Sequence, residues 1–174
     1  MTLTYIELKD SQPSKQDISA DLIDIDRNYD DSLINILIVD ENEGNLFLAK
    51  KAFNAQKNFS TSVLTITSGK KALEQLQSQE EKPDIILLGI NMPCENGKEA
   101  LRAIKSSSDF QDITVIMLSS SKMESDLREC QNLMADGYIA KPEKLEDYSE
   151  LVLHIRDYWA PRIQETSGVR NGKT

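Results

Sequence analysis

Residues that usually build metal or redox centres are scarce in this chain. Its 174 residues include two cysteines and one histidine. Cys94 and Cys130 form no closely spaced pair, and His154 has no second histidine near it, which argues against a zinc site. Two separate free thiols are typical of a reducing compartment, so we expect a cytoplasmic protein.

Long apolar runs and clusters of basic residues are also missing. No run approaches the ~20 apolar residues that a membrane-spanning helix needs, and the first residues lack the pattern of a signal peptide. The formal net charge is -9, and residues 1–33 alone hold eight acidic and three basic side chains, a balance of -5. Because no basic stripe is present to contact phosphate groups, we expect no nucleic-acid binding and no membrane association.

Short apolar runs and helical patterns alternate along the middle of the chain. The runs are rich in β-branched residues, and several are continuously apolar, which is typical of parallel strands covered on both faces. They occupy residues 34–39, 62–67, 84–88, 113–118 and 137–140. Apolar residues recur at helical spacing over 43–56, 69–79, 97–106, 123–134 and 143–159. Five repeats of this alternation predict a doubly wound α/β fold with a five-stranded parallel sheet and five helices.

Three regions follow from this pattern. We expect residues 33–160 to form the folded domain, 1–32 an acidic and partly disordered N-terminal extension, and 161–174 a flexible C-terminal tail. Within the extension, residues 17–25 favour two alternatives, a mobile arm or a docked helix of two turns.

Polar side chains follow four of the predicted strands at the point where each strand ends. Asp40 and Glu41 follow the first strand, Gly89 the third, Ser119 the fourth and Lys141 the fifth. Because the carboxyl ends of parallel strands meet at one edge of a sheet, these residues are expected to share one rim, where such folds bind ligands.

The segments around these positions carry a family resemblance. Residues 37–42 (LIVDEN), 87–93 (LLGINMP), 115–119 (VIMLS) and 137–142 (GYIAKP) resemble the receiver domain of two-component response regulators, in order and in spacing. Residues 155–159 (IRDYW) are similar to stand-alone receivers that work with bacterial phytochromes. The resemblance implies a flavodoxin-like sheet with strand order 2-1-3-4-5, and a histidine kinase or another signalling protein as partner.

The resemblance also implies a metal site and a phosphoacceptor position. Asp40 and Glu41, with the backbone carbonyl of Asn91, match the groups that hold Mg²⁺. Gly89 matches the aspartate that accepts the phosphoryl group, and glycine has no carboxylate to form an acyl phosphate. Asp84 is no substitute, because it lies five residues back on the same strand, roughly 16 Å away.

Three further positions match residues that respond to the phosphoryl group. Ser119 matches the hydroxyl that turns toward it, and Lys141 matches the ammonium that pairs with it. Tyr138 matches the aromatic switch that moves inward on activation. With no carboxylate at Gly89, we expect Mg²⁺ binding to be weakened and Lys141 to reach Asp40 directly.

These residues favour a degenerate receiver, which is not an enzyme and which acts by protein–protein interaction without aspartyl phosphorylation. One alternative is an ordinary phosphoacceptor receiver that carries an Asp-to-Gly substitution at position 89. Another is a flavodoxin-like binder of a small ligand, although no glycine-rich phosphate loop is present.

Two structural expectations concern the end of the domain. The resemblance implies a cis peptide bond between Lys141 and Pro142, which would aim the lysine at the acids. The stripe that ends at Trp159 favours either a homodimer through the final helix or docking of the acidic arm on the same surface, since Leu151, Tyr158 and Trp159 are expected beyond the cover of the sheet. The alternative is that Trp159 closes the core.

Overall fold

The apolar runs of the sequence form one six-stranded sheet. The computed structural model describes residues 5–7, 33–92, 95–120 and 123–163. The strand order is β1-β8-β7-β4-β2-β3. The strands are β1 (Tyr5–Glu7), β2 (Ile34–Val39), β3 (Thr61–Ile66), β4 (Ile85–Gly89), β7 (Thr114–Ser119) and β8 (Gly137–Ala140). Two short strands, β5 (Asn91–Met92) and β6 (Glu95–Asn96), form a separate ribbon after β4.

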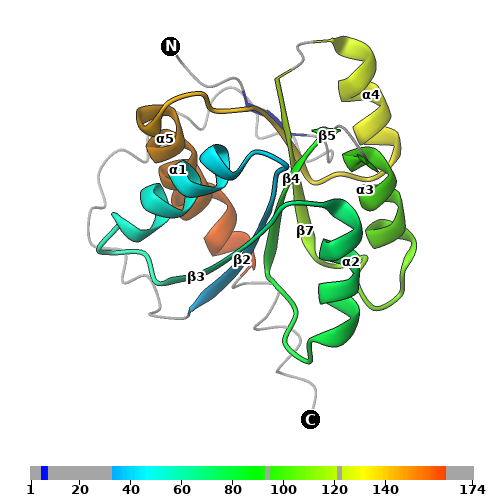
Figure 1. The fold of residues 1–174 in the computed structure, drawn as a ribbon, viewed down its shortest axis with the longest axis horizontal. Helices are drawn as coiled ribbons and strands as arrows, with labels where there is room; N and C mark the ends of the chain where they lie inside the picture. Colours follow the sequence, from blue (N-terminus) through cyan, green and yellow to red (C-terminus); the bar gives the residue numbers. More distant parts are fainter. Residues whose placement is uncertain (1–4, 8–32, 93–94, 121–122, 164–174) are drawn as a thin grey trace.

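Five helices cover the two faces of this sheet. They are α1 (Glu43–Asn54), α2 (Gly69–Ser78), α3 (Gly97–Ser106), α4 (Glu124–Asn132) and α5 (Leu145–His154), and a π-helical segment, Ile155–Trp159, continues α5. Helices α1 and α5 lie on one face, and α2, α3 and α4 lie on the other (Figure 1). Each face has its own buried apolar cluster, and β4 is buried along its whole length between them.

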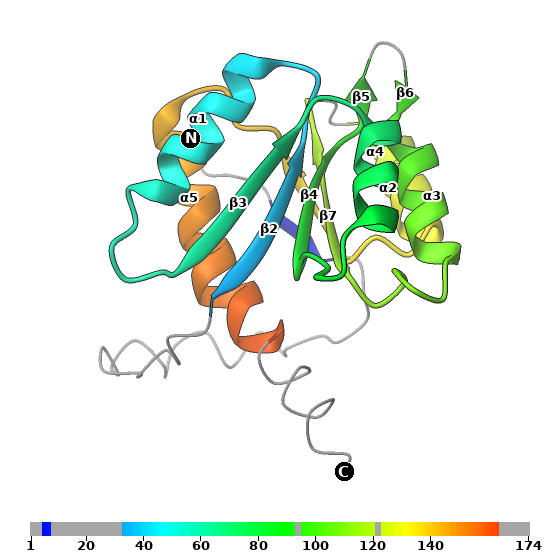
Figure 2. The same ribbon diagram turned by 60° about the horizontal axis from the view of Figure 1, so that its bottom comes forward.

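The predicted five-stranded parallel sheet and its order are confirmed. Strand β2 pairs in parallel with β3 and β4, and β7 pairs in parallel with β4 and β8. Figure 2 shows β3, β2, β4 and β7 in this order, with α1 and α5 on one side of the sheet and α2, α3 and α4 on the other. This order brings the carboxyl ends of β2, β4, β7 and β8 to the rim that the sequence predicts.

Strand β1 was not expected. It lies within the predicted N-terminal extension and pairs antiparallel with β8, in the register Tyr5 to Ile139, Ile6 to Tyr138 and Glu7 to Gly137. The sheet therefore has one more strand than predicted, and the edge of β8 is covered. The alternatives for residues 17–25 lie outside the described residues, as does Cys94.

Trp159 closes the core at the end of the final helix. It is 9% exposed, and a Cβ on Gly137 would come within 2.8 Å of its Cζ2 atom. Leu151 is fully buried. The expectation that Leu151 and Trp159 lie beyond the sheet is therefore wrong, because the core extends along the whole helix. Tyr158 is half-buried, stacked on His154 at 5.2 Å between ring centroids.

Within the described part of the chain, no helix combines the length and the apolar character needed to cross a bilayer.

Candidate functional site

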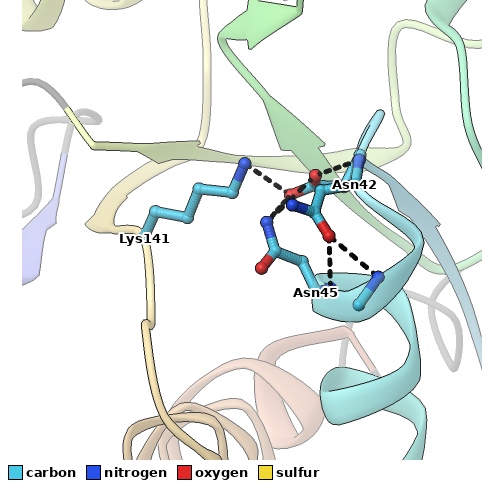
Figure 3. Close-up of polar contacts among 5 residues, drawn as sticks. Asn42, Asn45 and Lys141 are labelled. Atoms are coloured by element: carbon cyan, nitrogen blue, oxygen red, sulfur yellow. Dashed lines mark hydrogen bonds and ion pairs between the residues drawn. The ribbon is translucent and has the colours of Figure 1, made fainter.

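Asp40 is the centre of the polar rim. It ends β2 and is 2% exposed. Its Oδ1 atom accepts hydrogen bonds from the backbone N–H of Asn42 at 2.9 Å and from Nδ2 of Asn45 at 3.2 Å. Its Oδ2 atom lies 2.7 Å from Nζ of Lys141. The predicted direct contact between Lys141 and Asp40 is present, and three donors satisfy this buried carboxylate (Figure 3).

The start of α1 holds this arrangement in place. Asn42 is the N-cap of α1, and its Oδ1 atom accepts hydrogen bonds from the backbone N–H groups of Gly44 and Asn45, at 2.8 and 3.2 Å. Such a cap satisfies donors that have no partner inside the helix. It also fixes the first turn, so that Asn45 faces back toward Asp40.

Lys141 reaches the rim from the loop after β8. Its backbone N–H donates to the carbonyl oxygen of Ser119 at 2.8 Å, which extends the β7–β8 pairing to the rim. No cis peptide bond occurs in the described residues, so the predicted cis bond before Pro142 is wrong. The pairing with β7 brings Lys141 to the rim, and its four-carbon side chain reaches Asp40 with a trans peptide bond.

Gly89 ends β4 beside Asp40. A Cβ at this position would lie 3.3 Å from the carbonyl oxygen of Val39 and 3.9 Å from Cα of Asp40. Its backbone avoids the left-handed region, so the conformation does not require glycine. Gly97 differs, since a Cβ there would fall 1.9 Å from the carbonyl oxygen of Gly89. A small shift admits a side chain at Gly89, whereas Gly97 must remain glycine.

The residues predicted to hold a metal ion are only partly assembled. Glu41 is half-buried, and its Oε2 atom is buried with no hydrogen-bond partner among the described atoms. Asn91 is exposed in β5. Among the described residues, no group of three or more His, Cys, Asp or Glu side chains has an arrangement that could hold a metal ion. Asp40 and Glu41 offer two carboxylates, of which Asp40 already pairs with Lys141.

Ser119 and Tyr138 meet behind the rim. Ser119 is 2% exposed at the end of β7, and Tyr138 is 5% exposed in β8. Burial raises the pKa of the Tyr138 hydroxyl, and a hydrogen bond with the Ser119 side chain acts in the opposite direction. The aromatic ring of the predicted switch therefore lies inside the protein, in contact with the predicted hydroxyl.

The predictions from the sequence did not include the two amide groups, of Asn42 and Asn45, that donate hydrogen bonds to Asp40. They also did not include a second polar cluster. Asn42 had a usable signal, because Asn just before a helical pattern is a common N-cap. The cluster joins Lys98 of α3 to Asp126 and Glu129 of α4. Its two acids are three residues apart, on one face of a helix, but nothing local to the sequence indicates their partner.

The geometry of the rim agrees with the protein family that the sequence matches. Residues 36–153 match the Response regulator receiver domain. This chain belongs to the response-regulator receiver family. The receiver therefore acts in two-component signalling, and its five parallel strands and five helices are those of the flavodoxin-like fold.

Several relatives of this receiver are known. It is 31% identical to the probable methanogenesis regulatory protein FilR2 of Methanothrix harundinacea, over 71% of this chain and 82% of that protein. It is 28% identical to the response regulator Rcp1 of Synechocystis, over 74% of this chain and 90% of that protein. The crystal structure of the phosphorylated cyanobacterial phytochrome response regulator RcpA superimposes with a TM-score of 0.67 at 28% identity, covering 74% and 94% of the two chains. These similarities support the resemblance to phytochrome-associated receivers.

Proposed function

We propose that this receiver transmits a signal through protein–protein contacts without aspartyl phosphorylation and catalyses no reaction. The observation that carries the proposal is the end of β4, where Gly89 lies against Asp40 and presents no carboxylate. An acyl phosphate requires a carboxylate acceptor, so the covalent step of an ordinary receiver has no atom on which to occur at this position.

Neighbouring carboxylates are poor substitutes for the missing acceptor. Asp40 is 2% exposed and bonded to three donors. Asp84 lies at the opposite end of the sheet, where it accepts a hydrogen bond from the backbone N–H of Asn35 at 2.8 Å. Glu41 has one oxygen without a partner but lies on the neighbouring strand end, not on β4.

A divalent cation is expected to bind more weakly than in receivers that have an aspartate at the position of Gly89. A structure of Rcp1 is of its Mn(2+)-bound form, and it superimposes on this chain with a TM-score of 0.65 at 26% identity, over 73% of this chain and 94% of that one. Here Asp40 and Glu41, with the backbone carbonyl of Asn91, would hold the ion. The ion would have to displace Lys141 from Asp40, and it would gain no third carboxylate at Gly89.

The surface formed by α4, β8 and α5 is the proposed output surface. It contains Tyr138, whose ring is already inward. The edge of β8 is paired with β1, so a partner would contact the helices instead of adding a strand to β8. A histidine kinase or another signalling protein is the expected partner class.

One alternative is an ordinary phosphoacceptor receiver with an Asp-to-Gly substitution at position 89. The backbone at Gly89 favours it, because it lies outside the left-handed region and admits a Cβ once the carbonyl oxygen of Val39, 3.3 Å away, shifts by a few tenths of an ångström. A flavodoxin-like ligand binder has less support. A groove of about 280 Å³ lies between β3 and α2 and not at the carboxyl rim, lined by residues that include Leu64 and Gln75.

The test compares this protein with its Gly89→Asp variant in the presence of acetyl phosphate and Mg²⁺. We expect no phosphoryl incorporation into the parent, and hydroxylamine-sensitive labelling of the variant. Equal labelling of both proteins would contradict the proposal. A folded Gly89→Asp variant that takes no label would mean that Glu41 also disables the site, and would exclude the simple substitution alternative.

A further inference from the structure

An ion cluster centred on the buried Lys98 joins α3 to α4, with Asp126 partly buried and Glu129 half exposed. Lys98 is in the first turn of α3 and is 8% exposed. Its Nζ atom lies 2.7 Å from Oδ1 of Asp126 and also donates to Oε2 of Glu129, one turn further along α4. Burial alone would lower the pKa of Lys98, but the hydrogen bonds and charges of Asp126 and Glu129 outweigh it and raise the pKa. The lysine therefore stays charged, although the positive end of its own helix disfavours it.

Helix α4 has few other attachments to the core. Cys130 is its single buried residue, and Leu127 is one of its partly buried side chains that pack on the core. Helix α3, in contrast, buries Ala100, Leu101 and Ile104. Because so little apolar surface holds α4, the ion cluster contributes a large share of what fixes its position against α3.

Helix α4 shares part of the core with the buried Tyr138. Cys130 and Tyr138 belong to the same buried apolar cluster. Burial raises the pKa of the Tyr138 hydroxyl and the hydrogen bond with Ser119 lowers it. The charge of Asp126 raises this pKa further, and the charge of Lys98 lowers it. Helix α4, through Cys130, thus packs in the same apolar core as Tyr138.

We propose that Lys98 is the positioning residue of the switch, which keeps α4 closed over Tyr138 through Asp126 and Glu129. This ion cluster, instead of a phosphoryl group, then maintains the inward position of Tyr138, whose hydroxyl is hydrogen-bonded to Ser119. The inference rests on the proposed function, because it assumes that the inward position of Tyr138 defines the signalling state of the receiver. It names the residues that set that state in a receiver without an acceptor carboxylate.

Cys130 provides a built-in probe of α4 opening. In a Cys94→Ser background, Cys130 is the remaining thiol, and its labelling by Ellman's reagent requires α4 to move. The Lys98 charge lowers the pKa of this thiol, so removing the charge without opening would slow the labelling. Acceleration by Lys98→Met therefore reports opening and not electrostatics. We expect the labelling rate to rise at least about tenfold.

Two variants separate positioning from general stability. Lys98→Arg keeps the charge and is expected to restore the labelling rate to within about threefold of the parent. Lys105→Met breaks another buried ion pair of α3, in which Nζ lies 2.6 Å from Oδ2 of Asp136, without touching the Asp126 and Glu129 pair. It is expected to lower stability but to leave the folded-state exposure of Cys130 far less affected than Lys98→Met.

The position of Tyr138 is the second readout. Proteins containing 3-fluorotyrosine give a ¹⁹F resonance for this ring, assigned by its loss in Tyr138→Phe. Lys98→Met should shift that resonance toward the solvent-exposed value, and Lys105→Met should not. If Lys98→Met does not fold, Asp126→Asn is tested in its place, with the same expected shift of this resonance as the deciding readout, because loss of the Asp126 charge itself lowers the pKa of Cys130 and speeds its labelling.

The inference is overturned if Lys98→Met, or Asp126→Asn in its place, labels no faster than the parent or leaves the Tyr138 resonance unchanged. It is also overturned if Lys105→Met produces the same two effects. No phosphodonor is present in these measurements. Phosphorylation of the parent would therefore refute the proposed function without altering their outcome.

Discussion

Replacing Lys141 by methionine tests the electrostatics of the rim. The variant keeps most of the side-chain length but removes the ammonium that lies 2.7 Å from the Asp40 carboxylate. Asp40 is 2% exposed, so water cannot replace the lost partner fully. Breaking one half of a buried ion pair costs about 3–5 kcal/mol.

The structure reduces this cost for two reasons. Asp40 keeps its hydrogen bonds from Asn42 and Asn45, and the side chain of Lys141 is 15% exposed, so the pair is partly solvated. We therefore expect Lys141→Met to lower the free energy of unfolding by about 2–3 kcal/mol. With a urea m-value of about 2 kcal/mol/M, the unfolding midpoint should fall by about 1–1.5 M.

The assay is urea unfolding followed by circular dichroism, for Lys141→Met, Asp40→Asn and the double variant. The double variant leaves no unpaired charge, so it should be more stable than the sum of the single effects by about 2 kcal/mol. Lys50→Met, at an exposed lysine of α1, is the matched control and should change little. If Lys141→Met shifts the midpoint no more than Lys50→Met does, the account of the rim is wrong.

Three further perturbations follow from the structure. Met134→Gly should raise the free energy of unfolding by about 0.5–1 kcal/mol, because Met134 has a φ of 64° and is 58% exposed, whereas Met134→Ala should give no such gain in the same urea assay. Burial raises the pKa of Cys130 from 9.0 to about 11, so the unfolded thiol ionises first and stability falls as pH rises through this window. Cys130→Ala should remove at most about 2–3 kcal/mol of that fall, and an identical pH slope in parent and variant would count against a buried thiol. Deleting residues 1–10 should speed hydrogen exchange by about tenfold or more at those β8 amides that point away from β7, and unchanged exchange would mean that β1 does not protect the edge.

The sheet was predictable because its strands are short, mostly apolar and separated by helical patterns. Strands β2 and β8 match the predicted ranges, and the other parallel strands differ by one residue at their ends. Strand β1 was not predictable, since three residues are too few to show a period and its pairing with β8 is distant in the sequence. The sequence left the burial of Trp159 as one of two alternatives, because a helical stripe identifies a face but not how far the core extends along it.

The rim was predictable where it depends on which residue types end neighbouring strands. The contact of Lys141 with Asp40 follows from opposite charges at two strand ends of the same rim and from the missing carboxylate at Gly89, whose strand β4 lies between them. The cis bond was wrong because the pairing at Ser119 already directs the chain toward the rim. The ion cluster of Lys98 was not predictable, because its partners belong to a helix that lies beyond the next strand in the sequence.

Intact-mass spectrometry of the unaltered protein, after incubation with acetyl phosphate and Mg²⁺, tests the central claim most directly. The account predicts an unchanged mass, because Gly89 offers no acceptor and Asp40 is held by Lys141. A stoichiometric phosphoryl adduct on the folded protein, mapped by peptide sequencing to Glu41, Glu95 or a serine, would contradict it.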